Sequence, residues 1–146
     1  MDAWVGSVDG GLWGLFFSCF LAATILPFSS EAVLAAMAMG PWSTLALWAV
    51  ASAGNWLGGS TCYAIGRMGS IDRIGSWLRM DPAKVLRYER SVGRYGSWLA
   101  LLTWVPLIGD PLAVALGMGK APVLPVMVLM LAGKALRYFV VLQVLR

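Results

Sequence analysis

Four charged side chains interrupt the apolar stretches of this chain: Glu31, Asp110, Lys134 and Arg137. A charge near the middle of a bilayer costs at least ~2.5–3.5 kcal/mol on insertion scales, so each of these residues needs a partner or a function. Lys134 and Arg137 are three residues apart and therefore point to one face of a helix. We expect the four side chains to form one polar cluster, with Asn55 at the same depth as Lys134.

This cluster has two interpretations. In the functional one, a carboxylate enclosed by apolar residues gains or loses a proton as its access to water changes. Lys134 and Arg137 then hold an anionic group such as a phosphate. In the structural one, Glu31 and Asp110 neutralise the two cations and hold neighbouring segments together. The predicted substrate- and proton-binding residues are Glu31, Asp110, Lys134, Arg137 and Asn55.

The two acids belong to a sequence repeat. Residues 24–40, TILPFSSEAVLAAMAMG, match residues 103–119, TWVPLIGDPLAVALGMG, at an offset of 79 residues without a gap. The offset extends over residues 12–67 and aligns a proline and an acid of each stretch, Pro27 with Pro106 and Glu31 with Asp110. Because both pairs keep one offset, an internal duplication is favoured over a chance similarity of two apolar runs.

Composition places the chain in a membrane. Of its 146 residues 60% are hydrophobic and only 12% are charged, whereas soluble domains have roughly 25% charged residues. The mean hydropathy is +0.77. No basic residue precedes the first apolar run, so a cleaved signal peptide is not expected. Histidine is absent, and Cys19 and Cys62 lie singly without metal or redox spacing. No metal, cofactor or nucleic-acid partner is expected.

Two segments are long enough to cross the bilayer. Residues 42–65 contain no charged residue, and as a helix they exceed a hydrocarbon core of about 30 Å. Their counterpart in the second repeat starts with prolines near its first turn, where proline is tolerated. We predict transmembrane helices over about 42–66 and about 122–146.

The two acid-bearing stretches are too short to cross. The nine residues 32–40 and the nine residues 97–105 would each rise only about 14 Å as α-helices. A proline followed by a polar turn then predicts re-entrant hairpins over about 12–40 and about 96–119. Non-helical backbone at that depth needs protein or water around it, so the two apices should meet. The expected apex residues are Pro27, Ser29, Ser30, Pro106, Gly109 and Pro111.

The stretch between the repeats is polar. Residues 67–94 hold seven of the eleven basic residues, and Asp81 followed by Pro82 is typical of a helix start. We expect an amphipathic connector over 68–94 on the cytoplasmic surface. Each repeat then crosses the membrane an odd number of times, so the second is inverted and both termini lie outside. The predicted fold is one all-α integral membrane domain, 1–146, with repeat 1 over 12–67 and the core of repeat 2 over 95–146.

Four stretches also carry a family resemblance: PFSSEAVLAAM, GNWLGGSTCYAIGR, WVPLIGDPLAVALG and GKALRY. The chain resembles, over nearly its whole length, the DedA superfamily of membrane proteins, the VTT-domain group, and especially its short YqaA-like branch. The resemblance implies two opposed re-entrant loops and movement of lipids across the bilayer, as a scramblase or as a proton-motive-force-linked carrier of undecaprenyl phosphate. It maps the family's hairpin acids onto Glu31 and Asp110. Many members carry arginines on either side of the second hairpin's proline, whereas LLTWVPLIGD has none.

We therefore expect a transporter of a phospholipid or a lipid-linked phosphate in the bacterial cytoplasmic (inner) membrane, with protons as candidate coupling ions. The alternatives are a proton-coupled exporter of a small solute and a structural membrane component with buried ion pairs. An enzyme is not expected, because the chain has no histidine and only two intramembrane carboxylates. Membrane lipids are the expected partners, and a homo-oligomer is left open.

Overall fold

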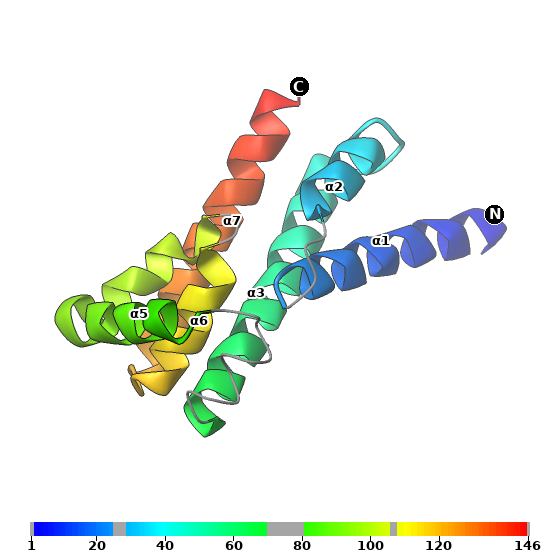
Figure 1. Cartoon of the computed structure of the whole chain (residues 1–146). Helices are drawn as coiled ribbons and strands as arrows, with labels where there is room; N and C mark the ends of the chain where they lie inside the picture. The colour runs from blue at the N-terminus through cyan, green and yellow to red at the C-terminus, as the bar shows by residue number, and fades with distance from the viewer. Residues whose placement is uncertain (1, 25–28, 70–80, 106–107, 146) are drawn as a thin grey trace.

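The structure is a computed structural model that describes residues 2–24, 29–69, 81–105 and 108–145. Every element in these ranges is a helix, which confirms the predicted all-α class (Figure 1). The elements are α1 (Asp2–Ala22), α2 (Ser30–Ala38), α3 (Thr44–Met68), α5 (Pro82–Tyr95), the 3-10 helix η1 (Gly96–Trp104), α6 (Gly109–Met118) and α7 (Val123–Val144).

The two long helices α3 and α7 pack against each other and run in opposite directions (Figure 1). Two indole rings of α3 fix their contact. Trp48 Nε1 donates a hydrogen bond to the carbonyl of Ala135 (2.8 Å), and Trp56 Nε1 donates one to the carbonyl of Met127 (3.0 Å). An indole N–H that is buried needs such an acceptor, so both rings are held across the α3–α7 interface.

Close approaches of backbone surround this pair of helices. At Gly54 of α3, an added Cβ would meet the carbonyl oxygen of Phe16 in α1. At Gly133 of α7, it would lie 2.7 Å from the carbonyl oxygen of Leu101 in η1. Small residues at helix crossings are typical of membrane proteins, because they let two backbones pack directly. Each long helix therefore packs a shorter helix directly against one of its glycines, α1 against Gly54 and η1 against Gly133.

The two segments expected to be too short to cross are the nine-residue helices α2 and η1. A 3-10 helix rises about 2.0 Å per residue, so η1 is about 18 Å long rather than the 14 Å expected for an α-helix. This length is still well below the hydrocarbon thickness of about 30 Å. Helix α1 has 21 residues and begins at Asp2, before the expected start of the first hairpin. The predicted apex prolines, Pro27 and Pro106, lie outside the described residues.

The outer surface of the helices is apolar, while several polar side chains lie inside. Large apolar side chains of α7 are exposed, among them Leu124, Val128, Leu136 and Val144. The buried polar residues include Ser30, Ser52, Asn55, Thr103 and Lys134. In soluble proteins, large apolar side chains are mostly buried and polar side chains are mostly exposed. This distribution fits a protein surrounded by lipid.

Length and hydropathy separate the helices. Helix α7, Val123–Val144, is long and apolar enough to cross a bilayer, whereas the part of α1 over Gly10–Ala22 is apolar but shorter. Helix α3 has 25 residues but is not apolar enough on the same measure. Its small and polar residues, including Ser52, Asn55 and Gly58, are buried against other helices. The low hydropathy of α3 thus comes from its inward face.

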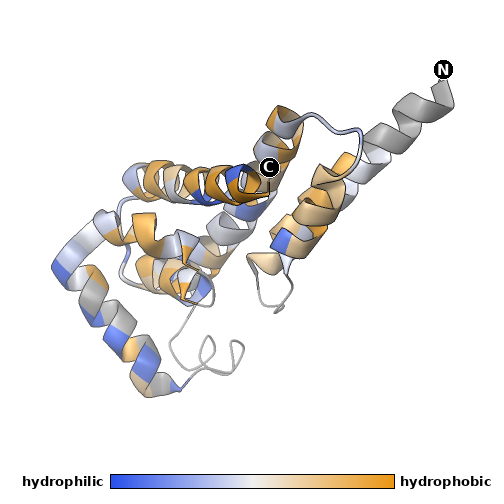
Figure 2. Cartoon of the chain, turned by 90° about the horizontal axis from the view of Figure 1, so that it is seen from above, coloured by the Kyte–Doolittle hydropathy of each residue, from blue (hydrophilic) through white to orange (hydrophobic). Residues whose placement is uncertain are grey.

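Helix α5 has a different character. Asp81 caps its first turn by accepting a hydrogen bond from the backbone N–H of Ala83 (3.0 Å), as predicted from the sequence. Its exposed residues include Lys84, Arg87, Arg90 and Arg94, and Figure 2 shows hydrophilic residues along the helix. Val92 is buried and lies where a Cβ on Gly119 would stand. The part of the connector over 70–80 lies outside the described residues.

Candidate functional site

Arg137 joins the two short helices. Its Nη2 donates to Oε1 of Glu31 in an ion pair, and its Nη1 donates to the carbonyl of Trp104 at 3.2 Å. Glu31 lies in the first turn of α2, and Trp104 is the last residue of η1. The Arg137 side chain is 15% exposed and that of Glu31 is 36% exposed. A single cation on α7 therefore contacts both segments that were predicted to be hairpin arms.

Lys134 forms a second, deeper centre. It is 2% exposed, and its Nζ donates a hydrogen bond to Oδ1 of Asn55 on α3. Asn55 in turn donates through Nδ2 to the carbonyl of Cys19 in α1 (3.3 Å). Asp110, in the first turn of α6, interacts electrostatically with Lys134. Two helices, α3 and α6, thus supply partners to one buried ammonium group, and α1 holds the amide of Asn55.

The four charged residues lie in two pairs that share one stretch of α7. Lys134 faces Asn55 and Asp110, whereas Arg137 faces Glu31 and η1. The spacing of three residues predicted one common face of the helix and one polar cluster, whereas in the structure the two cations contact different helices. A guanidinium with two acceptors and an ammonium with an amide and a carboxylate can each hold an anionic oxygen.

The serines of the predicted first apex have separate roles. Ser29 caps α2 and accepts from the backbone N–H of Ala32 (3.4 Å). Ser30 is buried, and its hydroxyl is 2.8 Å from the hydroxyl of Tyr138, where either atom can donate. Because Ser30 precedes Glu31 and Tyr138 follows Arg137, two adjacent contacts join α2 to α7.

At the second predicted apex, Gly109 begins α6 and is buried against the backbone of Thr103. Its N–H donates to the carbonyl of Val105 (2.9 Å). Thr103, also buried, donates its hydroxyl to the carbonyl of Ala100 (2.6 Å). Pro111 follows Asp110 in the first turn of α6, where a proline is tolerated. This turn therefore places Asp110 at the start of a helix.

Sequence reasoning missed two participants, Tyr138 and the carbonyl of Trp104. Tyr138 lies next to Arg137, but the corresponding residue of the first half is Gly59, so the repeat gave no reason to select it. A backbone carbonyl has no signature in a sequence. In the described ranges, no three His, Cys, Asp or Glu side chains come together as metal ligands would.

Comparison with known proteins places the chain in a family. The family model of the VTT domain matches residues 26–146. The chain is 37% identical over 134 residues to the inner membrane protein YqaA of Escherichia coli, across 89% of this chain and 87% of that protein, and equally to YqaA of Shigella flexneri. It is 32% identical over 139 residues to an uncharacterized protein of Haemophilus influenzae, across 88% and 83%. No solved structure matches. The chain therefore belongs to the VTT-domain (DedA) family of membrane proteins.

Proposed function

We propose that the chain is a lipid transporter of the bacterial inner membrane, which moves a phospholipid or a lipid-linked phosphate such as undecaprenyl phosphate. The observation that carries this proposal is Arg137. It lies between the two short helices, is largely enclosed, and already binds a carboxylate. A phosphate, like a carboxylate, is an anion that can accept two parallel hydrogen bonds from one guanidinium, so it can replace Glu31 on Arg137.

The fold proposed for this function is an inverted repeat. Adding the offset of 79 residues to Trp48 gives Met127, and adding it to Trp56 gives Ala135. The contacting pairs Trp48–Ala135 and Trp56–Met127 are therefore exchanged when the two halves are exchanged, although both hydrogen-bond donors lie on α3. Such a relation supports a two-fold axis between α3 and α7, which is the arrangement of many secondary transporters.

We further propose that α2 with α1, and η1 with α6, form two hairpins that enter the membrane from opposite sides. The short lengths of α2 and η1 support this reading. The exposed basic residues of α5 support a cytoplasmic connector, which puts the start of α3 and the end of α7 on the outer side. Arg137, with one contact to each predicted hairpin, then lies where the two hairpins meet.

In this scheme the ion pairs regulate access. Protonation of Glu31 removes its charge and weakens its bond to Arg137, which frees the guanidinium for a lipid phosphate. Departure of the phosphate restores the pair with Glu31, and α2 returns to α7. Lys134, which donates to Asn55 and interacts electrostatically with Asp110, places a second basic side chain deeper in the protein. Proton movement and phosphate movement are thereby coupled through one side chain.

Reconstitution tests the proposal. Liposomes that contain the purified chain are assayed for movement of labelled phospholipid and of a polyprenyl phosphate, with and without an imposed pH gradient. If the chain is a lipid transporter, liposomes with the unmodified chain move one of these lipids faster than liposomes with the Arg137→Met variant. Movement of neither lipid, with release of a small anion under the pH gradient, would favour the exporter of a small solute. No movement of any probe would favour a structural role for the ion pairs.

A further inference from the structure

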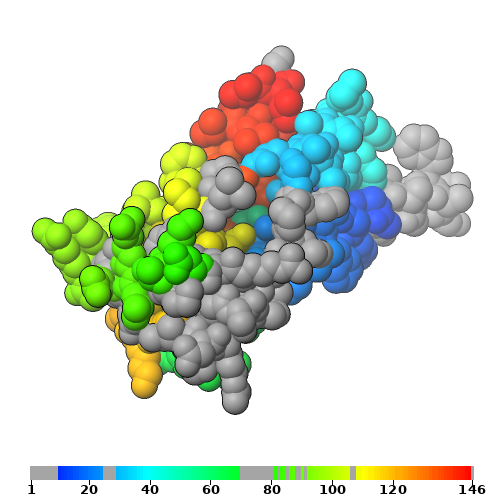
Figure 3. Space-filling view, viewed as in Figure 1, coloured from blue at the N-terminus to red at the C-terminus, as the bar shows by residue number. Residues whose placement is uncertain are grey.

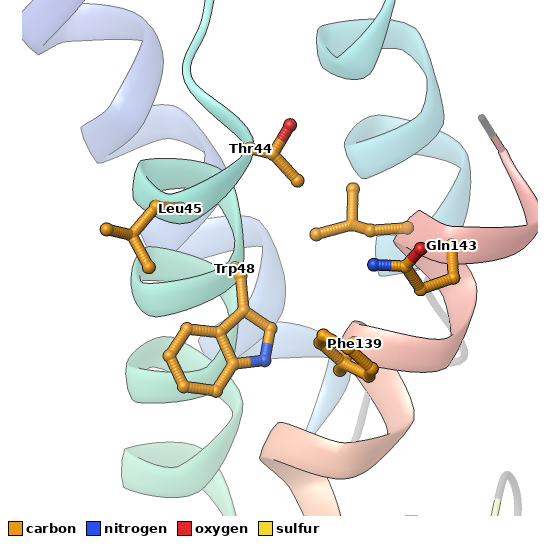
Figure 4. A pocket seen from close by; sticks show the side chains of 6 residues that line it. Thr44, Leu45, Trp48, Phe139 and Gln143 are labelled. Carbon is orange, nitrogen blue, oxygen red and sulfur yellow. The ribbon is translucent and has the colours of Figure 1, made fainter.

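A groove of about 610 Å³ lies between the first turns of α3 and the last turns of α7. Its lining residues are Thr44, Leu45, Trp48, Phe139, Leu142 and Gln143 (Figure 4). None of them is charged, and the volume is within the ~300–1,000 Å³ typical of ligand sites. The space-filling view shows a notch between the end of α7 and the α2–α3 turn (Figure 3). Neither Arg137 nor Lys134 lines the groove.

The polarity of the groove changes along its length. Thr44 is the first residue of α3, and Gln143 is the last but one of α7. Trp48 lies four residues after Thr44, and Phe139 lies four residues before Gln143. Both rings are therefore about 6 Å from the polar residues along the helix axes. Figure 4 shows the rings of Trp48 and Phe139 at a similar level on the two helices, with Thr44 and Gln143 nearer the other end of the groove. Each wall therefore runs from a neutral polar residue, past a neighbouring leucine (Leu45 or Leu142), to an aromatic ring.

The floor of the groove is fixed. The indole of Trp48 is tied to α7 by its hydrogen bond to Ala135, and Leu142 is buried in the core that also contains Tyr138. The groove is open along its outer side, because Leu45 and Phe139 are exposed large apolar residues. At the related end of the α3–α7 pair the space is closed, since Ser60 bonds to Met127 Sδ (3.2 Å) and Tyr63 bonds to the carbonyl of Ala121 (2.5 Å).

We propose that this groove binds one acyl chain of a glycerophospholipid. An acyl chain has a polar ester group at the membrane surface and hydrocarbon below it, which is the order of the groove's lining. The amide of Gln143 can donate a hydrogen bond to the ester carbonyl. A polyprenyl phosphate has no ester at that level, so the phospholipid fits better. The inference depends on the proposed function only in placing α3 and α7 in the bilayer.

The test is photo-crosslinking of the full chain in liposomes that contain a phosphatidylethanolamine with a diazirine in its acyl chain. Labelled positions are mapped by mass spectrometry. We expect Trp48 and Phe139 to be labelled about fivefold more than Val128, which is comparably exposed on α7 but outside the groove. Gln143→Trp, which fills the groove, lowers that labelling by about fivefold, whereas Val144→Trp changes it less than about twofold.

Equal labelling of Phe139 and Val128 would overturn the proposal, as would an equal loss with both tryptophan variants. Stronger displacement of the label by a polyprenyl phosphate than by unlabelled phospholipid would also overturn it, because the occupant would then not be an ester-linked chain. Labelling does not require transport. Transport measured in the same liposomes therefore reports on the proposed function independently of the groove.

Discussion

Lys134 and Asn55, which bond to each other in the protein interior, occupy matching positions of the two sequence halves, 79 residues apart. A contact between matching positions is expected where two related halves meet on a common axis. The two halves differ at this point, because one supplies an ammonium group and the other an amide. In the proposed inverted repeat, the two-fold axis therefore passes between two unlike side chains at this point.

Lys134→Met should destabilise the protein strongly. The substitution leaves the buried Asn55 without its donor and removes the cation that interacts with the half-buried Asp110. Removal of one partner of a buried charged pair costs about 3–5 kcal/mol. The measurement is thermal unfolding in detergent. Lys84→Met, at an exposed site on α5, is the control and should change the unfolding temperature little. An equal effect of the two substitutions would contradict the buried site.

Trp48→Phe and Trp56→Phe should each lower stability by about 0.5–1.5 kcal/mol, because each removes one hydrogen bond and leaves a buried carbonyl with one acceptor site unused. Since both bonds join an indole of α3 to a part-buried carbonyl of α7, at 2.8 and 3.0 Å, their effects should be similar. Denaturation in mixed micelles measures both. Trp98→Phe is the matched control, because Trp98 is 72% exposed. A loss at Trp98 as large as at Trp48 would show that the indole bonds contribute little.

Sequence reasoning reached the class of fold, the acid–cation partnership and the matching of Asn55 with Lys134, because each depends on residue type and spacing. It predicted one polar cluster where the structure has two pairs, because the grouping depends on how α7 is rotated against α2 and α6. Nor could it predict η1 as a 3-10 helix, because local hydrogen bonding, rather than composition, separates the two helix types. The groove beside Trp48 depends on tertiary packing alone.

Gly54→Ala should weaken the packing of α1 on α3. The added methyl would collide with the carbonyl of Phe16, and backbone atoms move less readily than the end of a side chain. Overpacking of this kind costs about 1–3 kcal/mol. Gly14→Ala is the control, because an added Cβ there has no neighbour within 4 Å. In a helix this control should instead gain about 0.5–1 kcal/mol. Equal stability of the two variants would argue against the close approach.

Single cysteines should report the proposed topology. Lys84→Cys on α5 should react with a maleimide only when the reagent reaches the cytoplasm, whereas Met39→Cys and Leu145→Cys should react with an impermeant maleimide from outside. Both native cysteines are buried and give a low background. If Met39→Cys and Leu145→Cys, like Lys84→Cys, reacted only with a maleimide that reaches the cytoplasm, the result would be inconsistent with the inverted repeat.

The last prediction concerns the ion pair of Glu31 and Arg137. Glu31→Gln keeps the shape of the side chain and removes its charge, and Arg137→Met removes the proposed phosphate ligand. Because the Glu31 side chain is 36% exposed, its loss should cost only about 1 kcal/mol or less. Transport in liposomes should nevertheless fall at least about tenfold in each variant. Asp110→Asn, with and without Lys134→Met, applies the same comparison to the deeper pair.

The double variant Glu31→Gln with Arg137→Met separates function from structure. It restores the balance of charge, so a structural ion pair predicts recovery of both the unfolding temperature and transport. A carboxylate that carries a proton and an arginine that binds a phosphate predict recovery of stability alone, since neither chemical group is present. Transport at the level of the unmodified chain in the double variant would leave Glu31 and Arg137 as structural contacts between α2 and α7.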